Sequence, residues 1–392
     1  MKIMETRAWR VLHLGNTNNI GFLNAKFMRA VGIQADLLTD QTDHITYQPL
    51  WSEPEGEPLW ARYYSSKIRH CFCLGRWRIP FPFAHRFHQI VDIVRQGRDY
   101  DILQAYNYDI ILCLAQSKRL VVAYCVGGDL NISALSRNWV GRLLRIAYQK
   151  ADIILYSNID MVSAVNALGL KHARYIPLPV DTEKFRSPSQ QEYKDLQTKL
   201  MPGVDFVCFS PTRHDWEVKG SDSLIAAWAD IVRWARGWGG SLCLVMCEWG
   251  KDLKRSQLLV KELGLEEWVC WVPLMDKMSL RDWYMIADVV ADQFRLKAFG
   301  LVALEAMACG KPVVASVDRE MAESFYSKPP PIFTARTADE IAEVVQTLAE
   351  NTFLRRSVGE QSRRWIEEHH APQVIVREHM AVYSSLLSGR RG

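Results

Sequence analysis

Short apolar runs alternate with longer amphipathic segments through the first half of the chain. The short runs are rich in Val, Ile, Leu and Ala, as buried strands are, and the longer segments repeat apolar residues every three or four positions, as helices do. The strand-like runs are RVLHLG, ADLL, DILQAY, LVVAYCV and ADIILYS, and the helical segments include GFLNAKFMRAVG and NWVGRLLRIAYQ. This alternation is typical of a parallel sheet with crossover helices.

A second series of the same kind starts at residue 205. Its strand-like runs are DFVCFS, SLCLVMCE, WVCWV, DVVADQ and VVAS, with helical segments such as SDSLIAAWADIVRWA, KRSQLLVKELG and SLRDWYMIA between them. A stretch rich in proline and charge, 177–203, separates the two series, and 338–387 is helical in pattern with a break at Pro372. We therefore expect two doubly wound α/β domains that face each other across a cleft, with ligands at the carboxyl ends of the strands.

Length and composition fit this organisation. A chain of 392 residues exceeds what one core usually supports, and a net charge of +4 is too mild to indicate nucleic acid as a partner. The charged start of the chain and the lack of a long uncharged apolar run predict a cytoplasmic protein without a spanning helix. The nine cysteines lack the spacing of a zinc site, so we expect reduced thiols and no metal.

The stretch KAFGLVALEAMACGKPVVAS, residues 297–316, joins a glycine turn to a short helix and then to a strand. Free N–H groups at the start of a helix, here near Phe299 and Gly300, bind anions, and glycine lets a ligand approach the backbone. Glu305 lies five residues further on, about 7 Å along the helix axis, which suits a carboxylate that accepts from the ribose hydroxyls of a nucleotide held by its diphosphate. The alternative is a glutamate that faces solvent.

A second candidate phosphate-binding element, this one cationic, precedes the helix that begins near Ser221. Arg213 and Lys219 lie six residues apart on the loop between a strand and this helix. Two cations on such a loop can neutralise a diphosphate, whereas the alternative is a solvated pair of surface charges.

Together these elements resemble the retaining GT-B glycosyltransferases of family 4. The resemblance rests on Arg213 with Lys219-Gly220, on FGLVALEAMACGKPVVAS, on the glycine loop RVLHLGNTNNIG and on YIPLPVDTEKF and WVPLMDKMSLRDWYMIADVV. It implies the GT-B fold, with two Rossmann-like domains and a C-terminal helix that crosses back to the first. The expected ranges are an acceptor-side domain at 1–180, a linker at 181–203, a donor domain at 204–370, and a C-terminal helix and tail at 371–392.

The resemblance also implies site residues. The donor, a nucleoside-diphosphate sugar, is expected to contact Gly15, Arg213, Lys219, Val272, Leu274, Lys297, Phe299, Gly300, Leu301, Val302 and Glu305. The backbone near Val272 and Leu274 would meet the base, and Glu305 the ribose. The catalytic residues expected are Arg213, Lys219 and Asp129, without a metal or other cofactor.

Two departures from the family pattern concern the sugar and the acceptor. Lys297 stands where the family usually has an acid that contacts the donor sugar, so one hypothesis is a donor sugar that carries a carboxylate, and the alternative is that Lys297 assists Lys219 at the phosphates. In the first domain, CVGGDL places Val126 where many members have a histidine, and Asp129 at the position of the acid. Asp129 is our candidate for a contact to sugar or acceptor, and the alternative is a helix N-cap.

The segment 61–88 carries cations interleaved with aromatic residues and no acid. Its cations are Arg62, Lys67, Arg69, Arg76, Arg78 and Arg86. Such a composition suits the headgroup boundary of a membrane. The family resemblance implies a lipid-linked or saccharide acceptor, which we expect at the inner membrane face. Binding to single-stranded nucleic acid and a basic loop that folds against its own domain are the alternatives.

The sequence therefore predicts a hexosyltransferase-type enzyme (EC 2.4) that moves a sugar from a nucleotide-sugar to a hydroxyl. A nucleotide-sugar epimerase or hydrolase of the same fold and a degenerate, non-catalytic scaffold are the alternative functions.

Overall fold

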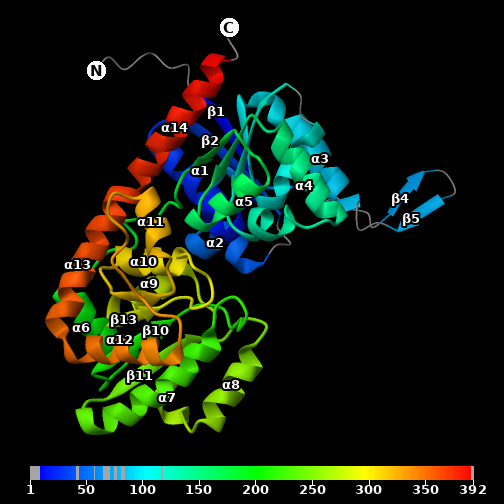
Figure 1. Cartoon of the computed structure of the whole chain (residues 1–392). Helices are drawn as coiled ribbons and strands as arrows, with labels where there is room; N and C mark the ends of the chain where they lie inside the picture. The colour runs from blue at the N-terminus through cyan, green and yellow to red at the C-terminus, as the bar shows by residue number, and fades with distance from the viewer. Residues whose placement is uncertain are drawn as a thin grey trace, which may run out of the picture. The chain divides into compact units, whose positions relative to one another are not determined.

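The computed structural model of this chain describes residues 9–40, 44–56, 58–64, 71–74, 77–80, 84–115 and 118–389. It divides into two units (Figure 1). Unit 1 comprises Met1–Pro179 and Pro372–Gly392, and unit 2 comprises Val180–Ala371. The segment 181–203, which the sequence analysis treated as a linker, therefore lies in unit 2.

Unit 1 is built on a seven-stranded parallel sheet of order β3-β2-β1-β6-β7-β8-β9. Its strands are β1 (Arg10–Leu14), β2 (Gln34–Thr39), β3 (Ala61–Tyr63), β6 (Ile102–Tyr106), β7 (Leu120–Cys125), β8 (Ile153–Tyr156) and β9 (Ala173–Tyr175). Its α-helices are α1 (Ile20–Ala30), α2 (Pro49–Ser52), α3 (Ala84–Gln96), α4 (Trp139–Lys150), α5 (Val162–Ala167) and α14 (Pro372–Gly389). The strands β6 and β7 are buried at every position, which explains why they read as continuous apolar runs.

Unit 2 has a six-stranded parallel sheet of order β12-β11-β10-β13-β14-β15. Its strands are β10 (Phe206–Ser210), β11 (Leu242–Cys247), β12 (Val269–Val272), β13 (Val289–Ala291), β14 (Val313–Ala315) and β15 (Ile332–Thr334). Its α-helices are α6 (Gln190–Leu200), α7 (Ser221–Trp238), α8 (Leu253–Glu262), α9 (Lys277–Ile286), α10 (Leu301–Ala308), α11 (Arg319–Phe325), α12 (Ala338–Glu350) and α13 (Thr352–His369). The prediction of two doubly wound parallel sheets is confirmed.

The core of unit 2 centres on Trp228 of α7. Its side chain is fully buried, and its indole N–H donates to the carbonyl oxygen of Trp268 at 3.0 Å. The indole therefore contributes a large apolar area to the core without leaving a buried donor unsatisfied.

The C-terminal helix α14 starts at Pro372 and packs on unit 1, beside α1 (Figure 1). Its buried face places Tyr383 against the sheet, where the tyrosine hydroxyl donates to Oε1 of Gln104 at 2.6 Å. Gln104 in turn donates to the hydroxyl of Tyr106 at 2.8 Å, and the ring of His379 stacks on Tyr124 at 5.7 Å. The expectation of a C-terminal helix that returns to the first domain is confirmed.

The segment 61–88 contains strands that the sequence analysis did not expect. Ala61–Tyr63 forms the edge strand β3, and β4 (Cys71–Leu74) pairs antiparallel with β5 (Trp77–Pro80). Arg62 is not a free membrane-facing cation, because its guanidinium donates to the hydroxyl of Tyr100 at 2.6 Å and pairs with Asp36 at 3.4 Å. Lys67, Arg69 and Arg76 lie outside the described residues.

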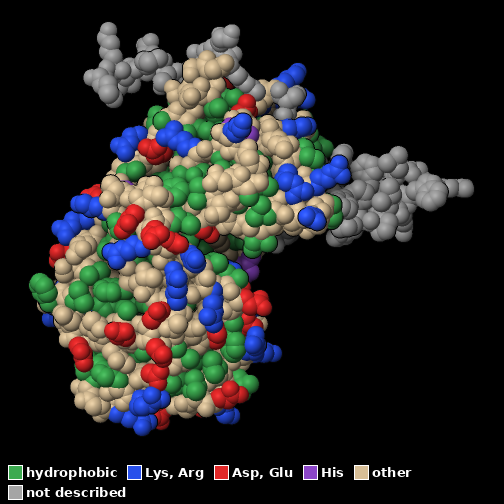
Figure 2. Space-filling view, in the orientation of Figure 1, with side chains coloured by type: hydrophobic (Ala, Val, Ile, Leu, Met, Phe, Trp, Pro, Cys, Tyr) green, Lys and Arg blue, Asp and Glu red, His purple; other side chains and the backbone are tan. Residues whose placement is uncertain are grey.

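One face of the molecule can be compared with the charge pattern of a nucleic-acid binder. On the face shown in Figure 2, Lys and Arg side chains are interspersed with Asp and Glu rather than gathered by sign. Among the helices that the structure describes, none is long and apolar enough to cross a membrane.

Two buried histidines of unit 1 make its stability dependent on pH. Burial lowers the pKa of His13 to about 3 and that of His379 to about 4, so both are neutral in the folded protein. In the unfolded chain both imidazoles bind a proton as the pH falls below about 6.5. The stability that the neutral imidazoles contribute is therefore present above about pH 6.5 and is lost as the pH falls toward their folded pKa values of about 4 and 3. We expect the free energy of unfolding to fall by about 1 kcal/mol per histidine between pH 7.5 and 5.5 in urea titrations.

The matched comparison is His379→Gln against His44→Gln, since His44 is an exposed histidine of the same unit. The first variant should lose about half of this pH dependence, and the second should retain it. Equal slopes in the two variants would contradict the assignment to buried neutral imidazoles.

Candidate functional site

The predicted donor residues gather where the strand order of unit 2 reverses. Strand β10 pairs with β11 on one side and with β13 on the other, so the loops after β10 and β13 leave the sheet at the same edge. This crevice is the usual ligand site of a doubly wound sheet. Arg213 and Lys219 lie on the loop after β10, and Gly300 and the start of α10 follow the loop after β13.

Lys219 ties these two loops together. Its ammonium donates to Oε1 of Gln293, and lies 3.8 Å from Oδ1 of the buried Asp292. The backbone joins the same loops, because the amide of Phe294 donates to the carbonyl oxygen of Lys219 at 2.8 Å. Burial lowers the pKa of Lys219, Asp292 opposes that shift, and the charge of Arg213 adds to it. A partly desolvated ammonium near a second cation favours an additional anion.

Arg213 is more accessible, with 43% of its side chain exposed. Its Nε lies 3.5 Å from Oδ2 of Asp215, which also receives Lys251 at 3.2 Å. The Asp215 carboxylate is thus held between two cations, and the Arg213 guanidinium keeps donors for a ligand. The structure therefore brings Arg213 and Lys219 to one loop with different degrees of exposure.

The start of α10 offers backbone donors at the same crevice. The amide of Gly300 donates to Oδ2 of Asp292 at 3.2 Å, and the first helical bond runs from Leu304 to Gly300. Among the described residues, the amides of Leu301 and Val302 have no recorded acceptor, as expected for the first turn of a helix. These N–H groups, with the helix dipole behind them, favour an anion.

Gly300 and Phe299, which precede this turn, stay predicted donor contacts through their backbone. Gly300 has φ −111°, and an added Cβ would lie 3.7 Å from Asp292, so the backbone there does not require glycine. Phe299 is buried and packs edge to face on Trp365 at 5.9 Å between ring centroids, so its side chain serves the core of unit 2.

Glu305 lies on the buried side of α10, with 3% of the residue exposed, so the alternative of a solvent-facing glutamate is wrong. Its Oε1 accepts from the ammonium of Lys277, and its Oε2 accepts from the hydroxyl of Tyr284 at 3.3 Å. Sequence reasoning missed Lys277, because no pattern links two residues that stand 28 positions apart.

Three further predicted donor residues lie at the end of β12 or on the loops after β12 and β13. Val272 ends β12 and is buried, with its carbonyl oxygen accepting from the amide of Glu248 at 2.8 Å, and Leu274 is half-buried on the following loop. Lys297 is exposed and makes no ion pair with the residues that the structure describes.

In unit 1, Gly15 follows β1 and has φ +83°. An added Cβ would lie 1.9 Å from Oδ2 of Asp109, so only glycine fits this turn. Gly15 lies beside the point where the strand order of unit 1 reverses between β1 and β6, the position expected of a ligand loop.

Asp129 has the geometry of a structural acid. It is 1% exposed, its Oδ1 accepts from the amide of Gly127 at 3.0 Å, and its Oδ2 accepts from the hydroxyl of Tyr148 at 2.9 Å. Burial raises the pKa of Asp129, and these hydrogen bonds oppose that shift. Asp129 is thus buried and bonded to groups of unit 1, and its contact with substrate stays a prediction. The carboxylate does not cap a helix from the N-cap position, which is Gly128.

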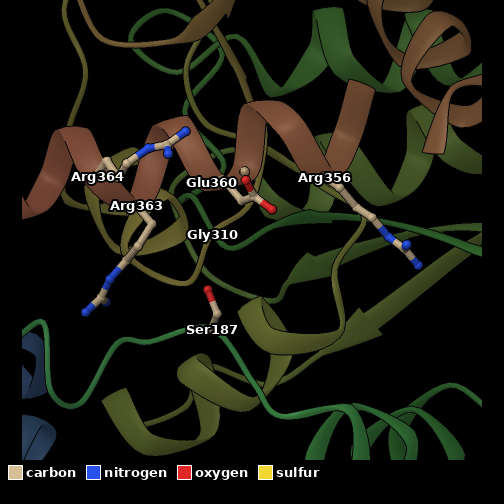
Figure 3. Close-up of a pocket in the computed structure, with 7 residues that line it drawn as sticks. Ser187, Gly310, Arg356, Glu360, Arg363 and Arg364 are labelled. Atoms are coloured by element: carbon tan, nitrogen blue, oxygen red, sulfur yellow. The ribbon is translucent and has the colours of Figure 1, made fainter. Parts of the chain in front are cut away.

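A basic pocket of about 420 Å³ lies on another part of unit 2 (Figure 3). It is lined by Ser187, Gly310, Arg356, Gly359, Glu360, Arg363 and Arg364. Arg363 points to the loop that holds Ser187 and donates to the carbonyl oxygens of Phe185 and Ala308 at 2.7 and 2.8 Å, whereas Arg364 points away from Ser187. None of the predicted donor residues lines this pocket, and Arg363 is already bonded to backbone carbonyl oxygens. We therefore assign no catalytic or binding role to the pocket.

The turn that presents Lys219 depends on Gly220. Gly220 has φ +70°, and a Cβ added to it would lie 3.1 Å from Cβ of Phe294 and 3.2 Å from Cγ of Arg295. Gly220→Ala should therefore lower the free energy of unfolding of unit 2 by about 1–2 kcal/mol in denaturant titrations, because Ala is strained at this φ and crowds the loop after β13.

The matched control is Gly237→Ala, because Gly237 lies in the last turn of α7 and an added Cβ would meet no atom of another element within 4 Å. At this end of the helix the substitution should stabilise by less than about 0.5–1 kcal/mol, the gain expected in a helix interior. If both variants moved in the same direction, strain at Gly220 would not be the cause.

Comparison with known proteins adds the family. Residues 198–365 match the family described as Glycosyl transferases group 1. The chain is 31% identical over 219 residues to the D-inositol 3-phosphate glycosyltransferase of Saccharomonospora viridis, covering 52% of this chain and 49% of that protein. It is 29% identical over 199 residues to the lipopolysaccharide core biosynthesis mannosyltransferase LpsB of Rhizobium meliloti, covering 46% of this chain and 54% of that protein. The alignments thus span about half the length of these relatives.

Solved structures show the same fold over nearly the whole chain. Anabaena Alr3699/HepE in complex with UDP and glucose superposes with a TM-score of 0.74 at 17% identity, covering 96% of this chain and 100% of that one. Residues 198–365 therefore resemble the glycosyl transferases group 1 family, and the chain as a whole has the GT-B fold.

Proposed function

We propose that this chain is a retaining glycosyltransferase (EC 2.4) that moves a hexosyl group from a nucleoside-diphosphate sugar to a hydroxyl acceptor. The observation that carries the proposal is the convergence of two cations, Arg213 and Lys219, with the unbonded amides of Leu301 and Val302 at the strand-order reversal of unit 2. The relatives support it, because Anabaena HepE is described with UDP and glucose and LpsB as a mannosyltransferase.

The proposed chemistry follows from where charge develops. The bond between the anomeric carbon and the diphosphate oxygen breaks, and a bond forms from that carbon to the acceptor oxygen. Negative charge grows on the departing diphosphate, and donors aimed at such a charge in advance contribute most of an electrostatic acceleration. Arg213 would hold the outer side of the diphosphate, Lys219 its buried side, and the start of α10 would add N–H donors.

The other steps require no protein nucleophile. The departing phosphate takes the proton that the acceptor hydroxyl loses, and the sugar is transferred with retention of its anomeric configuration, as the family resemblance implies. Two side-chain cations would stabilise the diphosphate where other enzymes use a metal ion. Asp129 has no part in this proposal.

For the acceptor we propose a class of molecule, a saccharide or lipid-linked intermediate at the cytoplasmic face of a membrane. Support comes from the name of LpsB, which places that relative in lipopolysaccharide core synthesis. Of the basic segment 61–88, Arg62 is committed to Asp36 and Tyr100, so any membrane contact would involve other cations of that segment.

Thermal shifts with UDP, GDP, dTDP and ADP test the donor site. Under the proposal, one of these nucleotides at about 100 times its Kd stabilises the wild type by about 2.7 kcal/mol, and Arg213→Ala removes most of this because a charge-assisted contact to phosphate is lost. The control is Arg233→Ala, since Arg233 is a highly exposed arginine of α7 paired only locally with Asp230. Absence of any shift at millimolar nucleotide, or an equal loss in the control, contradicts the proposed donor site.

Turnover assays then separate the functions of this fold. Transfer from the conjugate of the stabilising nucleotide to an added saccharide supports the transferase, product from donor alone supports an epimerase or hydrolase, and binding without turnover supports a scaffold. The donor set includes UDP-glucose and UDP-glucuronate, because Lys297 is exposed and without an ion pair among the described residues. If neutral and acidic sugars turn over equally, the hypothesis of a carboxylate-bearing donor fails.

A further inference from the structure

A buried ion pair joins the start of α9 to the middle of α10 in unit 2. Lys277 is the first residue of α9 and Glu305 lies in the middle of α10, and their side chains are 7% and 5% exposed. The Lys277 ammonium donates to Oε1 of Glu305, so the pair is both close and nearly dry. A buried carboxylate stays ionised only when such a partner compensates its charge.

The surroundings hold the Lys277 ammonium in one place. Asp276 caps α9 by accepting from the amides of Met278 and Ser279 at 2.8 and 3.0 Å, which fixes the first turn of the helix. The ring of Phe185 lies 5.9 Å from the ammonium, and Tyr284 packs edge to face on Phe185 at 6.1 Å. Lys277 therefore reaches Glu305 from the capped first turn of α9, with the ring of Phe185 near its ammonium.

The hydrogen bonds to Glu305 in the described part of the chain use half of the acceptor capacity of its carboxylate. Each carboxylate oxygen accepts about two hydrogen bonds. Lys277 occupies one position on Oε1, and the hydroxyl of Tyr284 occupies one position on Oε2 at 3.3 Å. One position thus remains on each oxygen, and two adjacent acceptors of this kind match the two hydroxyls of a cis-diol.

We propose that Lys277 is a positioning residue that holds the Glu305 carboxylate oriented to accept both ribose hydroxyls of the donor nucleotide. The inference rests on the proposed function, because it presumes a nucleotide at the start of α10. It adds the origin of the selectivity for a ribose over a deoxyribose, and assigns it to a side chain that itself does not touch the ligand.

The test compares nucleotides that differ only at the ribose. Dissociation constants for UDP and GDP, and for their 2′,3′-dideoxy analogues, are measured by calorimetry on wild type, Lys277→Met, Lys277→Arg and Glu305→Gln. The wild type should prefer the ribose form of its nucleotide by about tenfold or more, the factor expected of hydrogen bonds to a charged group. Lys277→Met should lose most of this preference with little change for the dideoxy analogue, and Lys277→Arg should keep part of it.

Folding is controlled separately. Lys277→Met leaves a buried carboxylate without its partner, which destabilises a protein. The double variant Lys277→Met, Glu305→Gln removes both charges and should show the same loss of ribose preference while melting closer to the wild type. Arg213→Ala should weaken the ribose and dideoxy forms by the same factor, because it contacts the diphosphate in the proposed site.

The inference is overturned while the proposed function stands if Lys277→Met keeps the wild-type ribose preference, whether its affinities are unchanged or fall equally for the ribose and dideoxy forms. Either would make the pair a structural tie between α9 and α10. Failure of the wild type to bind any of UDP, GDP, dTDP and ADP would instead overturn the proposed donor site itself.

Discussion

The candidate site depends on one buried cation. Lys219 leaves the loop after β10 and reaches Gln293 and Asp292 on the loop after β13, so a single side chain fixes two loops that the sheet brings to the same edge. A buried ammonium is costly without such partners. Asp292 also accepts from the amide of Gly300, so the same carboxylate orients the start of α10.

This arrangement explains why the site suits a diphosphate. Lys219 has a lowered pKa because of its burial and the nearby Arg213, and the charges of Asp292 and Asp215 oppose that shift. An incoming anion would therefore stabilise both cations and complete the hydrogen bonds of the first turn of α10. Preorganised donors of this kind need no rearrangement when charge develops during the reaction.

The sequence predicts the features of this protein that repeat locally. The buried strands β1, β6, β7, β10 and β11 appear as continuous apolar runs, so both parallel sheets were foreseeable. The edge strands β3 and β9 lack such a run because their residues are only partly buried, and they were missed. Helix α6 was also missed inside the proline-rich stretch, although Ser189 and Glu192 form a capping box that marks its start.

The site was foreseeable only in part, because its chemistry depends on contacts between distant residues. Arg213 and Lys219 share one loop, which spacing alone suggests. Spacing does not show that Lys277 pairs with Glu305, nor that the hydroxyl of Tyr148 donates to Asp129. Both contacts arise from packing between elements that are distant in the sequence.

Hydrogen–deuterium exchange with and without the stabilising nucleoside diphosphate tests the central claim most directly. Bound diphosphate should slow exchange in peptides that cover 211–222 and 299–305, because both contain backbone amides at the strand-order reversal of unit 2. Protection confined to the Arg-rich segment 356–364 of α13, or no protection in either predicted peptide at saturating nucleotide, would contradict the assignment of this crevice as the donor site.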